Sequence, residues 1–516
     1  PIFAINYLQH IIDMKKNYLL LLLCAFFCAC ASQPDVTVEK PEIRFKDGKL
    51  RIAQFTDVHW DTGESERGSD EHLPKTIKNI VESENPDILV FTGDVVTGYP
   101  LVEGWRVFID FMHELGIPYA VVMGNHDPET AAEKDADGKY IRWETQAVRD
   151  SIFTYLEQSP LFLGERGPAE LKGMGHYTVP VLASDGSEKV MSVLYCMDSY
   201  DYSTDPRVDG YGWFSHEQIG WFRDQSKAYT AANDGTPIPS LAFFHIPLPE
   251  YHLVKDFYDT VGKCLETPCS PEINTGMFAA MFEMQDIFGA FVGHDHDNDF
   301  IGQYRGIALA YGRAAGVDTY GALPKGGRII DLYEGQKCFD TWIIDEDCNK
   351  TDVYYYPSAI SDNDIDERKL LPASDVNPQQ KGASYKYYEG PFKNVRAMVK
   401  EGQLLDKGVL ESFDITGAKA NNHFGYEFSS WVAVPETAVY KFVVGSDDGA
   451  ALWIDGNLVV DNDGSHSFSE KTGKVYLEKG FHKVDLKYFD STHGQKLYVY
   501  AVDKKNNRYD DIFYVR

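Results

Sequence analysis

Residues 50–59 read Leu-Arg-Ile-Ala-Gln-Phe-Thr-Asp-Val-His, an apolar run that ends in the motif Asp57-Val58-His59. Four further motifs of polar residues also follow apolar runs: Gly93-Asp94, Gly124-Asn125-His126-Asp127, His245-Ile246-Pro247 and Gly293-His294-Asp295-His296. Short apolar runs bounded by turn residues predict buried strands. We place these strands at residues 50–56, 87–92, 118–123, 190–197, 240–244 and 287–292.

Amphipathic segments alternate with these strands, and we expect helices at residues 76–84, 105–115, 149–158 and 216–231. Strand–helix alternation predicts βαβ units and one layered α/β domain, which we place at residues 43–356. Ligands of open α/β sheets bind beyond the carboxyl ends of the strands. The five motifs are therefore expected to meet at one edge of the domain.

The motifs offer carboxylate, amide and imidazole groups, which are ligands for divalent first-row metals such as Mn, Zn or Fe. Seven ligands are too many for one tetrahedral ion and suit two ions that share one ligand. We predict that the first metal is held by Asp57, His59, Asp94 and His296. We predict that the second is held by Asp94, Asn125, His245 and His294, so that Asp94 bridges. A water between two such ions would be acidified and could attack as hydroxide.

The composition is that of a soluble globular chain, with 43% hydrophobic and 25% charged residues. The 49 Lys and Arg against 79 Asp and Glu give a net charge of −30. Such a chain repels nucleic-acid backbones, so we expect no nucleic-acid partner. An anionic substrate would need a local positive source, which two metal ions would supply.

The full set of motifs resembles the calcineurin-like metallophosphoesterase superfamily, whose core is a four-layer α/β/β/α sandwich. The resemblance implies that the seven residues named above are metal ligands and that the substrate is a phosphate ester. It also implies that His126 contacts phosphate or protonates the leaving group. A pairing of His126 with Asp127 is chemically reasonable for a general acid, and we take these two residues as the catalytic pair.

Other positions resemble purple-acid-phosphatase-related enzymes, with one departure. The metal-bound tyrosine that purple acid phosphatases carry three residues after the bridging aspartate is replaced here by Thr97. The segment Tyr311-Gly312-Arg313 is similar to relatives of that group, and Arg313 is a candidate substrate contact. A structural ion pair is the alternative role for Arg313.

The N-terminus predicts export. Residues 1–13 precede Met14 and are expected to be an upstream artefact, and residues 14–30 have the basic start and short apolar run of a signal peptide. The segment Phe27-Cys28-Ala29-Cys30 resembles a bacterial lipobox, which implies lipidation of Cys30, a tether at residues 31–42 and a lipid anchor in the cell envelope. An ordinary cleavable signal with an incidental cysteine is the alternative.

Five cysteines follow Cys30. Cys264 with Cys269, and Cys338 with Cys348, are near enough in sequence to pair across loops, which an exported protein permits. Cys196 lies within an apolar run and is expected to be a buried small hydrophobe.

The last part of the chain changes character. Residues 357–384 are polar and without periodicity, which predicts a linker. Residues 385–516 hold short alternating runs with turn signals such as Asp455-Gly456, so we expect an all-β sandwich. Around residues 445–462 the sequence resembles the protective-antigen-type β-sandwich found beside secreted glycosidases and adhesins.

That second resemblance implies a calcium-dependent glycan site at Asp447 and Asp448, since paired carboxylates suit calcium. A polar hairpin turn with two solvated aspartates is the alternative, and the module could instead pack on the catalytic domain. We predict a metal-dependent phosphatase or phosphodiesterase that acts outside the cytoplasm. A glycan-binding surface lipoprotein with a vestigial metal site is the alternative function.

Overall fold

The computed structural model describes residues 39–61, 69–98, 101–129, 133–134, 140–141, 145–492 and 494–515. The predicted signal peptide, Cys30 and most of the predicted tether lie outside these residues. In the described part of the chain, no helix has the length and apolar character that crossing a membrane requires.

Two seven-stranded sheets form the first domain. One has the order β1 (Ile43–Arg44), β7 (Tyr177–Leu182), β8 (Val190–Cys196), β9 (Ser240–Phe243), β10 (Ile287–Val292), β12 (Ile307–Tyr311) and β11 (Ile301–Tyr304). The other has the order β16 (Ile360–Ser361), β15 (Lys350–Tyr356), β14 (Phe339–Asp345), β13 (Gly326–Tyr333), β2 (Lys49–Phe55), β3 (Ile88–Thr92) and β4 (Tyr119–Val122). Within each sheet the central strands run parallel, β8–β9–β10 in one and β2–β3–β4 in the other, and each of these except β8 is followed by a motif.

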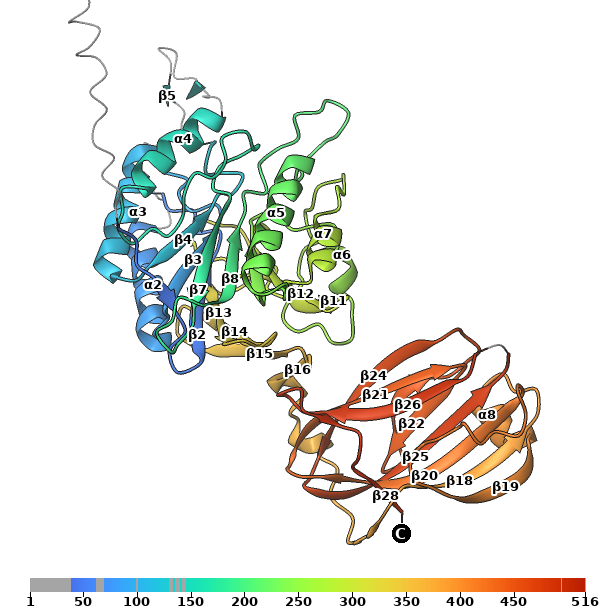
Figure 1. Cartoon of the computed structure of the whole chain (residues 1–516). Coiled ribbons are helices and arrows are strands. Elements are labelled where there is room, and N and C mark those ends of the chain that lie inside the picture. The colour runs from blue at the N-terminus through green and yellow to red at the C-terminus, as the bar shows by residue number, and fades with distance from the viewer. Residues whose placement is uncertain are drawn as a thin grey trace, which may run out of the picture. The chain divides into compact units, whose positions relative to one another are not determined.

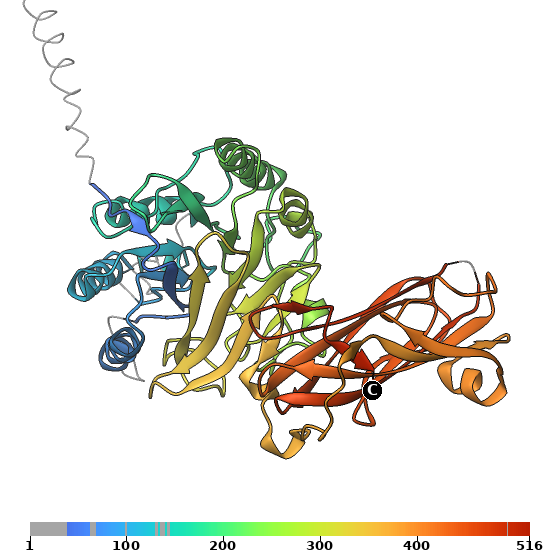
Figure 2. The same cartoon turned by 60° about the horizontal axis from the view of Figure 1, so that its bottom comes forward.

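Helices cover the outer side of each sheet (Figure 1). On one side lie α2 (Ser69–Glu84), α3 (Leu101–Leu115) and α4 (Thr145–Leu156), and on the other lie α5 (His216–Ala232), α6 (Tyr251–Val254) and α7 (Met277–Met284). Figure 2 shows the same order of layers after a 60° turn. The predicted four-layer α/β/β/α sandwich is confirmed.

Strand β8 shows why the sequence produces two apolar layers. Successive side chains of a strand point to opposite faces, so Leu194 and Cys196 join the core between the sheets. Val193 and Tyr195 instead pack under α5 and α7. A strand that is buried on both faces reads as a continuous apolar run, which is the pattern at residues 190–197.

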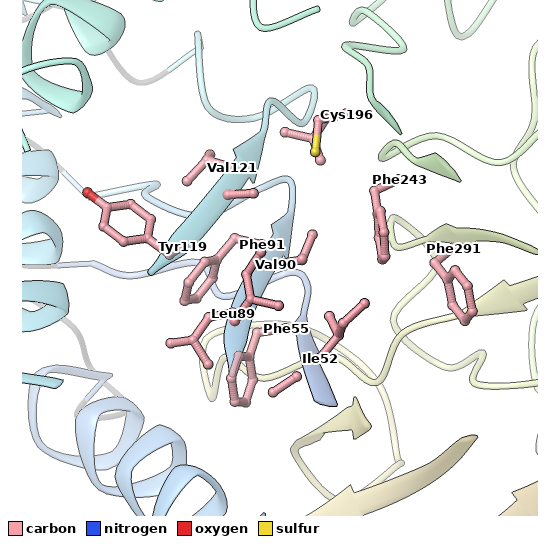
Figure 3. Close-up of a cluster of buried hydrophobic side chains, with 14 of the residues drawn as sticks. Ile52, Phe55, Leu89, Val90, Phe91, Tyr119, Val121, Cys196, Phe243 and Phe291 are labelled. Atoms are coloured by element: carbon pink, nitrogen blue, oxygen red, sulfur yellow. The ribbon is translucent and has the colours of Figure 1, made fainter. Parts of the chain in front are cut away.

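The core between the sheets is rich in aromatic side chains. Figure 3 shows Phe243, Phe291 and Cys196 of one sheet near side chains of β2, β3 and β4 in the other. The rings of Phe243 and Phe291 stack with centroids 5.4 Å apart, and Phe291 also meets Phe339 of β14 at 5.6 Å. This packing fixes the spacing of the two sheets whose strand ends carry the motifs.

Each predicted strand and helix of the first domain overlaps an observed element of the same type. The antiparallel strands β13, β14 and β15, which complete the second sheet, are elements that the apolar-run pattern does not predict. A short two-stranded sheet, β5 (Glu133–Lys134) with β6 (Tyr140–Ile141), also lies outside the prediction.

The segment between the domains contains only short elements, η1 (Asp362–Asp364), η2 (Glu367–Lys369) and β17 (Gln380–Lys381), after β16. The C-terminal module then forms an eight-stranded sheet and a four-stranded sheet. The eight-stranded sheet contains β17, β18 (Ala383–Glu389), β19 (Gln403–Leu410), β20 (Phe424–Val434), β22 (Ala450–Ile454), β23 (Asn457–Asn462), β25 (Gly480–Asp490) and β28 (Phe513–Val515).

The four-stranded sheet contains β21 (Ala438–Asp447), β24 (Ser469–Leu477), β26 (Lys496–Val502) and β27 (Arg508–Tyr509), and one core joins the two sheets. The helix α8 (Val395–Glu401) packs on the eight-stranded sheet near β25. The hairpin between β22 and β23 turns at Asp455 (φ 47°) and Gly456 (φ 81°), as expected for a tight turn that needs positive φ at both positions. The expected all-β sandwich is confirmed.

The cysteines differ from expectation in one respect. Cys196 is buried, as predicted for a small hydrophobe, but Cys264, Cys269, Cys338 and Cys348 are free thiols in the structure. The sulfurs of Cys264 and Cys269 face backbone carbonyls of their own loop, at Glu266 and Thr267, rather than one another.

Candidate metal centre

The loops after β2, β3, β4, β9 and β10 bring the five motifs together. Four of the motif residues, Asp57, His59, Asp94 and His294, have positive φ values between 45° and 81°. Left-handed backbone is costly for non-glycine residues and is found where a functional site over-determines it. The strand ends therefore turn sharply to direct these side chains into one buried place.

Six of the seven predicted ligands form two groups. Asp57, His59 and His296 make one group and Asp94, His245 and His294 make the other, with ligand atoms within 4.8 Å of one another in each. The seventh residue, Asn125, has its Oδ1 atom 3.1 Å from Nε2 of His245. The structure thus brings all seven residues together at one place, with six of them divided between the two groups.

Asp94 lies between the two groups. Its Oδ2 atom is 3.6 Å from Nε2 of His59 and 3.1 Å from Nε2 of His245. Its Oδ1 atom accepts a hydrogen bond from the backbone amide of His126. One carboxylate oxygen is therefore fixed by the backbone while the other faces residues of both groups.

Hydrogen bonds fix how the ligand side chains are presented. Nδ1 of His245 donates to the carbonyl of Thr92, so Nε2 is the nitrogen that faces Asp94. A histidine whose second nitrogen is held in this way is the usual form of a metal ligand. The Asp57 carboxylate accepts from the Thr56 hydroxyl and from the amide of His294, so it is oriented as well.

Two observations indicate that these residues could hold a pair of cations. Four buried polar atoms of the predicted ligands have no hydrogen-bond partner among the described residues: Nε2 of His59, Oδ2 of Asp94, Nε2 of His294 and Nδ1 of His296. Unpaired buried polar atoms are costly and need a partner.

The second observation is the effect of the buried carboxylates on the pKa of His245. Burial lowers the pKa of His245, but the Asp94 carboxylate outweighs it and raises the pKa to about 10. Two buried carboxylates therefore attract positive charge at this place, and divalent ions would supply it.

The expected pairing of Asp127 with His126 is wrong. The Asp127 carboxylate is fully buried and accepts hydrogen bonds from the backbone amides of Asp94, Val95, Val96 and Gly124. With its oxygens engaged in this way, Asp127 ties the loop after β3 to the loop after β4. It is a structural anchor and does not contact the His126 ring.

Glu129 is the partner that sequence reasoning missed. Its Oε2 atom lies 2.6 Å from Nδ1 of His126, and the turn from 126 to 129 is closed by a backbone hydrogen bond. Burial lowers the pKa of His126, but Glu129 and Asp94 outweigh it and raise the pKa. The signal in the sequence is an acidic residue three positions after the histidine, one turn away, rather than the adjacent one.

Of the two roles considered for Arg313, a substrate contact and a structural ion pair, the structure shows the ion pair. It is buried, its guanidinium pairs with Asp299, and it donates to the carbonyl of Pro324. It does not line the cavity at the metal centre. Arg313 is therefore placed as the ion-pair partner of a neighbouring loop and not as a substrate contact.

An open cavity of about 340 Å³ leads to the two groups. Besides motif residues it is lined by residues that the sequence did not single out for this site: Tyr211, Cys269, Asp318, Thr319 and Tyr320. The rings of Tyr211 and His294 meet edge to face with centroids 4.4 Å apart, and the rings of Tyr320 and His296 stack at 4.1 Å. The sequence pattern does not place these tyrosines at the metal centre, because they lie in loops outside the five ligand motifs.

A centre of this design at the strand ends of a four-layer sandwich is that of a metal-dependent phosphoesterase. Residues 50–298 match the calcineurin-like phosphoesterase family, and residues 382–512 match the PA14 domain. The chain belongs to the calcineurin-like phosphoesterase family and carries a C-terminal PA14 domain.

Its relatives include phosphatases. A protein named probable inactive purple acid phosphatase 29, from Arabidopsis thaliana, is 30% identical over 322 residues, which cover 57% of this chain and 79% of the relative. Phosphatase DCR2 of Saccharomyces cerevisiae is 28% identical over 49% of this chain and 45% of its own length. A dimetal phosphatase from Danio rerio aligns over 59% of this chain and 98% of its own, with 13% identity and a TM-score of 0.37.

The role of Asp127 as an anchor can be tested with Asp127→Asn. An amide nitrogen beside backbone N–H groups cannot accept their hydrogen bonds, so we expect the free energy of unfolding to fall by about 1–3 kcal/mol. Thermal unfolding followed by circular dichroism measures this loss. Glu129→Gln is the matched control, because Glu129 is partly exposed and should leave the unfolding midpoint unchanged. Equal midpoints for the two variants would contradict the anchor.

Proposed function

We propose that this chain hydrolyses phosphate esters by means of two divalent transition-metal ions held at the strand ends. The observation that carries the proposal is the convergence of two groups of buried ligand atoms on one shared carboxylate, Asp94. When bound, such ions neutralise phosphoryl oxygens and lower the pKa of water. Asp57, His59, Asp94 and His296 would hold one ion, and Asp94, Asn125, His245 and His294 the other.

His126 supplies the group that the chain itself would present to the ester. Its Nδ1 atom is held by Glu129, which leaves Nε2 as the nitrogen that can reach a substrate in the cavity. Despite burial, Glu129 and Asp94 raise the pKa of His126, which favours the imidazolium form. Nε2–H can then give its proton to a leaving oxygen while Nδ1–H stays hydrogen-bonded to Glu129. Phosphomonoesters and phosphodiesters both fit this arrangement.

A binding protein with a vestigial metal site is the alternative function. Several relatives carry the word inactive in their names, including the Arabidopsis thaliana protein above. In this chain all seven ligand positions hold metal-binding residue types, and six of them converge in two groups. That convergence favours the enzyme.

The proposal predicts metal-dependent turnover. Metal-stripped protein reloaded with Mn²⁺, Zn²⁺ or Fe²⁺ should hydrolyse 4-nitrophenyl phosphate or bis(4-nitrophenyl) phosphate. Asp94→Asn should lower kcat by at least about a hundred-fold, because it weakens the ligand shared by both ions, and elemental analysis should show lost metal. His126→Ala should lower kcat by about 10²–10⁴-fold with metal content retained, as for a general acid.

His216→Ala is the control, since this histidine is exposed at the start of α5. Its kcat and metal content should equal those of the unaltered protein. Full activity in Asp94→Asn would exclude the bridging role, and no turnover with any of the three metals would favour the alternative function.

We further propose that the chain is exported and anchored by lipid at Cys30, with the catalytic domain outside the cytoplasm. Support comes from the basic start at Met14, the short apolar run and the cysteine at its end. A single acyl chain binds membranes only weakly, so stable anchoring needs more than one.

This proposal predicts different behaviour of two cysteine variants in a bacterial host. In detergent phase separation the unaltered chain and Cys28→Ser should enter the detergent phase, and Cys30→Ser should remain in the aqueous phase or uncleaved. Partition of Cys30→Ser like that of the unaltered chain would contradict lipidation at this residue.

For the PA14 domain we propose calcium-dependent glycan binding at Asp447 and Asp448. Support comes from Asp448, which is buried and accepts from the amides of His466 and Ser491 instead of lying in solvent. Asp490 adds a third carboxylate: both its oxygens are buried without a hydrogen-bond partner in the described structure. Burial and the neighbouring Asp448 and Asp447 raise its pKa to about 6, so a cation would be stabilising here.

Calcium binding to the full chain is measured by titration calorimetry after the protein has been treated with EDTA. We expect Ca²⁺ to bind and to raise the unfolding midpoint of the domain, and Asp490→Asn to weaken binding by at least about ten-fold, because a charged ligand is lost. Asp461→Asn, at an exposed position of β23, is the control. Unchanged affinity in Asp490→Asn would exclude the third carboxylate.

A further inference from the structure

Tyr320 is an exposed aromatic ring at the mouth of the metal cavity. Its ring stacks on His296 with centroids 4.1 Å apart and an angle of 26°, and 53% of the residue is still exposed. A ring that is held flat with much of its surface open offers a platform for another planar group.

Hydrogen bonds lock this ring in place. The Tyr320 hydroxyl donates to Oε2 of Glu266, and Oε1 of Glu266 accepts from the amide of Asp297, the residue after His296. The plane of the ring is thereby tied to the same turn that carries His296.

The loop behind the ring is closed as well. Asp297 Oδ1 accepts from the amides of Ala322 and Leu323. Gly321 has φ +112°, and a Cβ atom there would lie 2.6 Å from Oδ1 of Asp297, so glycine is required. A platform fixed in advance loses little conformational entropy when it binds a ligand.

A second aromatic surface lines the same cavity. Tyr211 packs its ring edge to face with His294, the ligand of the other group, and stacks with Tyr202 at 5.7 Å and 23°. Tyr202 is 39% exposed. Each of the two metal-ligand groups therefore has a tyrosine ring beside it at the cavity wall.

We propose that Tyr320, with Tyr211, forms an aromatic platform that selects phosphate esters carrying a planar aromatic group next to the phosphate. The proposal rests on the proposed function, because the phosphate is taken to lie at the metal centre. Stacked rings gain free energy beyond the area they bury. Esters with an aryl or heteroaromatic group are then favoured over alkyl esters of the same size.

The test uses two phosphonates that differ only in planarity, benzylphosphonate and cyclohexylmethylphosphonate, and measures Kd by titration calorimetry on the full chain loaded with Mn²⁺ or Zn²⁺. We expect benzylphosphonate to bind about five-fold more tightly. Tyr320→Leu should abolish this preference, and Tyr320→Phe, which keeps the ring, should retain it. Tyr258→Leu, at an exposed tyrosine away from the cavity, is the control and should also retain it.

The kcat/KM values for benzyl phosphate and cyclohexylmethyl phosphate give a second readout, and their ratio should follow the same order among the variants. Equal Kd values for the two phosphonates in the unaltered chain, or a preference that survives in Tyr320→Leu, would overturn the inference alone. A ring that only shields His296 would change metal content in Tyr320→Leu without changing the preference. If neither phosphonate binds the metal-loaded chain, the proposed function fails together with the inference.

Discussion

Asp57 and Asp94 are two carboxylates buried where the two sheets meet. The rest of the catalytic domain must compensate their charge and hold them in position. Their ion-pair partners in the described structure are histidines, not lysine or arginine. Buried negative charge without strong compensation is destabilising. Left-handed backbone at four motif residues and a set of unpaired ligand atoms are both understandable if cations complete the site. The aromatic core between the sheets then holds the strand ends at the spacing that this centre needs.

Much of this could be predicted from the sequence because the information is local. An apolar run followed by a polar motif identifies a buried strand and places its last residues at the carboxyl edge, so the sequence predicts that the five motifs meet there. The choice of the seven ligands and their division into two sets also rest on the resemblance to the metallophosphoesterase superfamily. Strands β13 to β15 pair antiparallel, outside the strand–helix alternation, and β13 and β15 begin with glycine or polar residues, at Gly326 and Lys350. The pairing of β13 with β2 joins residues far apart in the chain, and no local pattern encodes it.

The errors at the site have a common physical cause. Adjacency along the chain predicts Asp127 as the partner of His126, yet adjacent side chains on a turn point in different directions. Glu129, one turn onward, reaches the ring. Arg313 follows a strand near the motifs, which makes it a candidate substrate contact. In the structure its guanidinium instead pairs with the buried carboxylate of Asp299. The cavity tyrosines depend on loop conformations that the sequence does not reveal by spacing.

The four amides gathered by Asp127 have a consequence for how the protein handles its ions. They fasten the loop that carries Asp94 to the loop that carries Asn125 by bonds that do not involve any cation. In many small metalloproteins, by contrast, the ion itself supplies the folding energy. A metal centre whose loops are already held together by such hydrogen bonds can lose one kind of metal ion and bind another without unfolding. The kind of metal ion bound there then depends on which metals are available in the surrounding compartment.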